Sequence, residues 1–169
     1  MPNESGESHL QQLDDETAVL RLRDDERSLL EDECALLLQQ PLPPATAALY
    51  GRVRAAAETG RIEASLFDPT QSLLEVGIES GRTRAIHGPH AEMAASRLYA
   101  RLPRGKAYRA TVDAVNEALK TLEGQELAEV SFQASGPGSC TLILDTGARR
   151  TTISIRRTGL AVSSLEIVV

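Results

Sequence analysis

The sequence predicts an α+β fold in which about four to five helices precede a four-stranded antiparallel meander, with one face of the sheet covered by helices. Three observations predict this fold. Apolar residues follow the 3.6-residue period of a helix up to about residue 123, and the two-residue period of a strand from about residue 127 onward. Prolines and glycines divide the chain into segments of ordinary element length. The links between the predicted strands are too short for parallel crossovers, so we expect antiparallel strands.

The length of 169 residues suits one domain with a hydrophobic core of its own. We expect that single α+β domain to span residues 17–169, with its helical part at 24–123 and its sheet at 127–169. Residues 1–16 are polar, acidic and without periodicity, which predicts a disordered acidic tail. Residues 17–23 fit either an edge strand or the first turns of a helix, because leucines alternate there with arginines over a short stretch.

Five segments of the first part of the chain carry helical signals. The first spans about 25–40, where acidic residues favour the N-terminus and prolines follow the end. The second spans about 44–60 and the third about 68–81, and each has a proline near its start and a glycine at its end. The fourth begins after Gly88. The fifth follows a break at 102–105 and keeps the helical period without a fault.

Four strands are expected near 129–134, 141–145, 150–157 and 160–169. Alternate residues of these strands should form one apolar face, made of Val130, Phe132, Leu142, Leu144, Ile153, Ile155, Leu165 and Ile167. Such a face needs a cover, and the fifth helix is its neighbour in sequence. We therefore expect that helix to bury Val115 and Leu119 against the sheet.

The net charge of −6 is unevenly distributed along the chain. Residues 1–44 carry a charge of −8 and residues 45–169 carry a charge of +2. This asymmetry indicates an acidic N-terminal arm beside a more basic body. A net acidic chain is a poor electrostatic partner for DNA or RNA, so we expect no nucleic acid among its partners.

Several features bear on the cellular compartment. No apolar run approaches the ~20 residues of a membrane-spanning helix, and the N-terminus lacks the pattern of a secretory signal. Cys34 and Cys140 lie far apart in the sequence, and we interpret them as two free thiols of a reducing compartment. We therefore expect a cytoplasmic protein without a membrane partner. Sixteen arginines against two lysines are typical of GC-rich coding and favour a bacterial source.

The triplet His90-Ala91-Glu92 opens the fourth predicted helix. It resembles the zinc nucleoside and nucleobase deaminases, in which the histidine binds zinc and the glutamate moves protons for a zinc-bound water. The resemblance implies that His90 is a metal ligand and Glu92 the catalytic acid/base of a hydrolase. That family also carries Pro-Cys-x-x-Cys at a second helix, whereas the only downstream cysteine here, Cys140, leads into a strand. Because one thiolate is missing, we expect no metal and no cofactor.

A second signal is the basic window, residues 82–109, which holds seven basic side chains and a single acid, Glu92. Its candidate anion- or partner-binding residues are Arg97, Arg101, Arg104, Lys106 and Arg109. The start of a helix favours anions, and arginines four apart lie on one helix face. The alternative is that the window is ordinary solvated surface. The acidic residues at 14–16, 24–26 and 31–33 could also pair with it, within one chain or between two chains.

No constellation of catalytic groups emerges, so the sequence favours a protein without enzymatic activity. Our first hypothesis is a non-enzymatic interaction, assembly or regulatory protein that acts through an oligomer or partner interface, with a homodimer expected. The apolar end of the last strand, at Val168 and Val169, has no charged or proline guard and could pair with a second strand. The alternatives are a regulatory domain that binds a small anion or ligand at the basic window, and a degenerate deaminase-like hydrolase.

Overall fold

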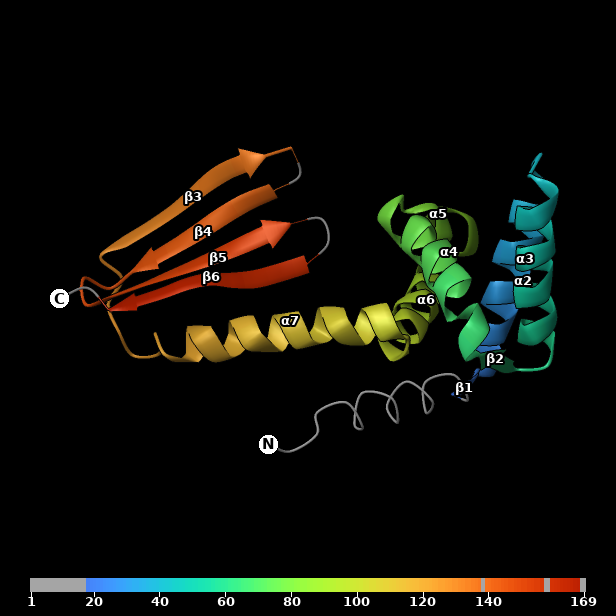
Figure 1. Cartoon of the computed structure of the whole chain (residues 1–169), viewed down its shortest axis with the longest axis horizontal. Coiled ribbons are helices and arrows are strands. Elements are labelled where there is room, and N and C mark those ends of the chain that lie inside the picture. Colours follow the sequence, from blue (N-terminus) through green and yellow to red (C-terminus); the bar gives the residue numbers. More distant parts are fainter. Residues whose placement is uncertain (1–17, 138, 157–158, 168–169) are drawn as a thin grey trace, which may run out of the picture. The chain divides into compact units, whose positions relative to one another are not determined.

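The computed structural model describes residues 18–137, 139–156 and 159–167, and it has the predicted α+β fold with helices first and sheet last (Figure 1). The predicted tail at 1–16 and the predicted strand end at Val168–Val169 lie outside the described residues. The chain divides into two compact units, of which the first ends at Pro103 and the second begins at Arg104. The single domain predicted for residues 17–169 stays a prediction.

The first unit is mainly helical. Its elements are β1 (Val19–Arg21), α2 (Asp24–Leu38), α3 (Pro44–Glu58), β2 (Arg61–Glu63), the 3₁₀ helix η1 (Ala64–Leu66), α4 (Phe67–Glu79), α5 (Arg82–His87) and α6 (Pro89–Arg101). The predicted helices at 25–40, 44–60 and 68–81 correspond to α2, α3 and α4. None of the described helices is both long and apolar enough to cross a membrane.

Within the ambiguous segment 17–23, residues Val19–Arg21 form the strand β1. It pairs antiparallel with β2, with Leu20 opposite Ile62, and the Leu22 N–H donates to the Gly60 carbonyl oxygen at 2.9 Å. Ile62 is fully buried. The strand therefore forms because a partner about forty residues away supplies its hydrogen bonds, which local periodicity does not reveal.

The core of the first unit is aliphatic, in keeping with the scarcity of aromatic residues. Leu30 of α2, Val53 of α3, Ile62 of β2, Leu98 of α6 and Leu102 are each fully buried. Every element of this unit longer than six residues contributes a buried apolar side chain to one cluster. Burial of such side chains is the dominant favourable contribution to folding.

Two features of the helical region differ from the prediction. Residues 82–87 form the short helix α5, which is too brief to show a helical period in the sequence. The expected break at 102–105 reduces to Leu102, whose extended backbone (φ −85°, ψ 160°) is the conformation that a following proline favours. Pro103 then begins the next helix directly, because a first-turn residue needs no intrahelical N–H bond.

The second unit contains most of α7 (Pro103–Lys120), followed by β3 (Glu129–Gly136), β4 (Ser139–Asp145), β5 (Arg149–Arg156) and β6 (Gly159–Ile167). The strands pair in the order β3-β4-β5-β6, all antiparallel, which confirms the predicted meander. Gly147, at φ 81°, makes the turn between β4 and β5.

A bulge adjusts the register of the last strand. Thr152 lies opposite Ser164 and Ile153 lies opposite Val162, so Ser163 has no residue opposite it. The extra residue changes the alternation of β6 by one position. The apolar residues of β6 on both sides of the bulge therefore lie opposite odd-numbered residues of β5. Their spacing in the sequence nevertheless breaks the two-residue period of a strand, because the bulge adds one residue.

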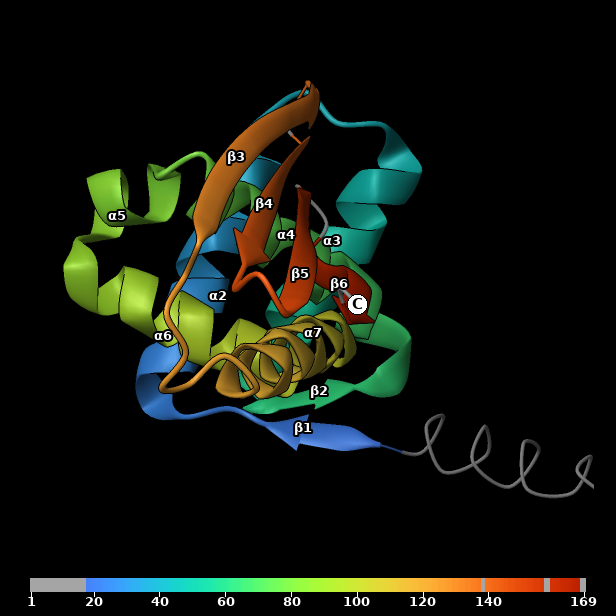
Figure 2. The same cartoon turned by 90° about the vertical axis from the view of Figure 1, so that its left-hand side faces the viewer.

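Helix α7 covers only part of the sheet. It runs along the sheet on the side of β5 and β6 (Figures 1 and 2). Val115 of α7 and Ile153 of β5 are buried, whereas Leu119 is only partly buried. Val130 lies opposite Leu144 and Phe132 lies opposite Leu142. Val130 and Phe132 are nevertheless exposed. The apolar face is therefore covered near β5 and open at β3.

Candidate functional site

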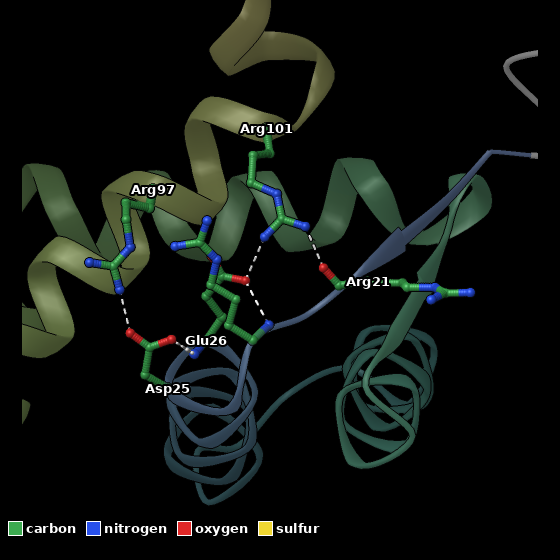
Figure 3. A network of polar contacts seen from close by, with 6 residues as sticks. Arg21, Asp25, Glu26, Arg97 and Arg101 are labelled. Carbon is green, nitrogen blue, oxygen red and sulfur yellow. Dashed lines mark hydrogen bonds and ion pairs between the residues drawn. The ribbon is translucent and has the colours of Figure 1, made fainter.

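The two arginines of the basic window on α6 are engaged by acids of α2, as Figure 3 shows. Arg97 forms an ion pair with Asp25, and both side chains are substantially exposed. Arg101 donates through Nη1 to Glu26 Oε2 at 2.7 Å and through Nη2 to the backbone carbonyl oxygen of Arg21. The acidic and basic stretches thus meet within one chain at these positions. An external anion would have to displace a carboxylate from each arginine.

Glu26 is the buried member of this network. Glu26 is fully buried, whereas the Arg101 side chain is about one third exposed. Glu26 Oε2 also accepts the Arg23 backbone N–H at 2.9 Å, which satisfies a free donor at the start of α2. Glu26 Oε1 is buried without a hydrogen-bond partner. The network therefore joins the start of α2 to α6 and fixes their relative position.

A second buried carboxylate lies two turns along α2. Glu33 pairs through Oε2 with Arg82, and its Oε1 accepts the Thr83 hydroxyl at 2.9 Å. His87 Nε2 lies 3.7 Å from Glu33 Oε1 and has no hydrogen-bond partner among the described residues. All three partners belong to the short helix α5. Glu33 belongs to the acidic group 31–33 that was considered as a partner of the basic window, and its spacing from Glu26, Leu29 and Leu30 puts it on the apolar face of α2.

The remaining candidates of the basic window lie on α7 in the second unit. Arg104, Lys106 and Arg109 are exposed, and Arg104 has interactions of its own. Lys106 and Arg109 are three residues apart, which is one helical turn. The five candidate residues are therefore divided between the two units. Anion binding at any of them stays a prediction.

The deaminase-like residues lie at the first turn of α6. His90 is exposed, and Glu92 pairs with Arg84, with Arg84 Nη1 3.1 Å from Glu92 Oε2. Cys140 lies on β4 of the second unit. In the part of the chain that the structure describes, no three His, Cys, Asp or Glu side chains gather as metal ligands. Among these residues, the fold therefore adds no further metal ligand to the deaminase-like pair His90 and Glu92.

Both cysteines are free thiols, and they differ in environment. Cys34 is completely buried beside Glu33, and Cys140 is partly exposed. Burial raises the pKa of the Cys34 thiol from 9.0 to about 12, with a smaller contribution from the neighbouring charge of Glu33. Cys34 is therefore a packed, protonated thiol at neutral pH rather than a nucleophile.

The outer strand of the sheet is the most distinctive exposed surface. Val130 and Phe132 of β3 are 57% and 65% exposed, and Leu127 just before the strand is also exposed. Leu127 and Leu144 of β4 line an open hollow together with Leu119 and Leu122. Among the described residues β3 pairs with β4 alone. The alternation of residues predicts Val130 and Phe132 on the covered face, but it does not show how far one helix extends across that face.

The chain matches no known protein family, no curated protein and no solved structure.

Proposed function

We propose that the protein is a non-enzymatic interaction and assembly protein that associates with a second copy of itself through strand β3. The observation that carries this proposal is the exposure of Val130 and Phe132 on an outer strand of the sheet. Large apolar side chains grouped on an exposed strand are typical of an interaction surface. An outer strand also offers backbone N–H and C=O groups to a further strand.

The composition of β3 supports pairing rather than protection from it. Soluble proteins usually guard an outer strand with charges, prolines, bulges or a short length. Strand β3 has eight residues, no proline and a single charge, Glu129. Its one irregularity comes near its end, between Ala134 and Gly136. The central residues 130–134 therefore form a regular strand without a guard.

A second copy is the partner that this strand fits. A two-fold pairing of β3 with its own copy is antiparallel, because the same surface serves both chains. Centred on Ser131, such a pairing places each Phe132 opposite the Val130 of the other copy. It also places Glu129 opposite Gln133, so the two like charges do not face one another. The apolar faces of both sheets then become continuous.

We also propose a cytoplasmic location in a bacterial cell. Support for the compartment comes from the two cysteines, which are both free thiols as in a reducing environment. The proposal of a bacterial cell is supported by the preference for arginine over lysine in the sequence.

The oligomeric state of the full chain tests the proposal. Sedimentation equilibrium over a range of protein concentrations should show a monomer–dimer equilibrium. Phe132→Arg should weaken the dimer at least about tenfold, which corresponds to about 1.4 kcal/mol. Val76→Arg is the matched control, because Val76 is 58% exposed but lies on α4 of the first unit. The Val76→Arg variant should have the same dimer dissociation constant as the wild type.

Two results would overturn the proposal. One is a wild-type chain that stays monomeric at every concentration, which would leave the exposed strand to a different protein partner. The other is a dimer that Phe132→Arg leaves intact, which would place the interface elsewhere on the molecule.

A further inference from the structure

Helix α5 is held to the first unit by polar contacts rather than by apolar packing. Of its six residues only Thr83 is buried. Ile86, its one large apolar residue, is 54% exposed, and Ala85 is exposed as well. The neighbouring helices, in contrast, bury leucines and alanines in the core. Few buried apolar contacts are the mark of a segment that opens locally at low cost.

The polar contacts of α5 converge on one carboxylate. Arg82, Thr83 and His87 all lie at Glu33, whose side chain is 2% exposed. The further ion pair of α5, between Arg84 and Glu92, lies near the surface and contributes little. The buried Glu33 contacts therefore decide whether α5 is docked.

Glycines in left-handed backbone conformations lie at both ends of α5. Gly81 has φ 69° and Gly88 has φ 85°, which side-chain-bearing residues rarely adopt. Glycines permit changes of backbone angle at these two positions, as a hinge at each end of α5 requires. A third glycine, Gly77 of α4, leaves space for the Thr83 hydroxyl, because a Cβ at position 77 would collide with Thr83 Oγ1.

We propose that α5 is a latch, residues 82–87, that Glu33 holds closed and that opens about Gly81 and Gly88 while the other helices of the first unit stay folded. Opening breaks the contacts of Glu33 with Arg82 and Thr83 and removes little apolar surface from the core. The aliphatic cluster formed by α2, α3, α4 and α6 keeps its packing in the open form.

Hydrogen exchange of the full chain, followed by mass spectrometry, tests the latch. In the wild type the hydrogen-bonded amides of Ala85 and Gly88 should exchange at least about tenfold faster than those within α3 and α6. Glu33→Gln should speed the exchange of α5 further and leave that of α3 unchanged. Glu31→Gln is the control on the same helix, because Glu31 pairs with Arg27 at the surface.

A steric variant tests the same latch without changing a charge. Gly77→Ala should displace Thr83 from Glu33 and speed exchange in α5, whereas Gly51→Ala, a helical glycine with open space around it, should not. Exchange of α5 at the same rate as α4 and α6 in the wild type would overturn the proposal. So would Glu33→Gln and Gly77→Ala variants that either leave α5 unchanged or accelerate every helix of the unit equally.

Discussion

Individual acidic residues of α2 have very different roles although they are alike in the sequence. Asp25 and Glu31 form ion pairs at the surface, whereas Glu26 and Glu33 are buried with arginine partners. The seven-residue spacing of the buried pair matches two helical turns and puts both on the face that carries Leu30. Net charge alone conceals this difference, because it counts a buried carboxylate and a solvated one equally.

Arg101 should contribute more to stability than Arg97. Replacing Arg101 with Leu leaves the buried Glu26 carboxylate without its cation, and we expect a loss of about 2–4 kcal/mol, after a discount for the partial exposure of Arg101. Arg97→Leu breaks an exposed pair and should cost about 0–1 kcal/mol. Urea unfolding of both variants measures the two values. Equal losses would mean that the burial of Glu26 has no energetic consequence.

Cys34 should be unreactive in the folded protein. Its raised pKa keeps the thiol protonated, so a disulfide reagent such as Ellman's should modify Cys140 first and Cys34 only on unfolding. Fast reaction of two thiols in the native chain would contradict this.

The same pKa shift predicts a pH dependence of stability. The unfolded thiol ionises near 9.0 and the folded one only near 12, so the contribution of Cys34 is complete below pH 9.0 and is lost as the pH rises towards 12. Urea midpoints of the wild type should fall across this window more steeply than those of Cys34→Ala. Parallel slopes would show that Cys34 has the same pKa in both states.

At the scale of elements, long periodic segments follow the sequence closely and short ones do not. Helix α7 keeps one apolar period over many turns, and its burial of Val115 was expected from that period. Leu119 was expected to be buried and is only partly so, because α7 ends near this point and an open hollow lies beside it. Helix α5 has fewer than two turns and hence no period to detect.

Two valines on the second unit test the packing of α7 against the sheet. Val115→Ala removes two buried methyl groups and should cost about 2 kcal/mol of unfolding free energy. Val130→Ala makes the same chemical change on the exposed strand β3 and should stay within about 0.5 kcal/mol in monomeric protein. Thermal or urea unfolding at low protein concentration compares them. Equal effects would show that α7 does not cover the sheet.

At the scale of the whole molecule, the buried apolar residues form separate groups. The main cluster contains residues from Leu29 to Leu102, all in the first unit. The buried apolar residues of the second unit are Val115, Leu122 and Ile153, among those described. The prediction of one domain rests on total length and composition.

The one-domain prediction has a calorimetric test. If residues 17–169 unfold as one domain, Val53→Ala in the first unit and Val115→Ala in the second should both lower the same single transition. Two transitions, each lowered by its own variant alone, would show that the prediction is wrong and that each unit unfolds independently.

The fold class, the main helices and the antiparallel character of the sheet follow from the sequence alone, whereas the strand order comes from the structure. The first three depend on periodicity, prolines and glycines within a few residues of one another, and short links leave an antiparallel meander as the simplest arrangement. Three further features emerge only from the folded arrangement: residues 19–21 form a strand, Glu26 and Glu33 are buried, and β3 stays open. Each of these depends on partners that lie far away in the chain, such as Arg101 for Glu26, or on how far one helix extends across a sheet. Packing fixes such contacts, and the local pattern of residues carries no record of them.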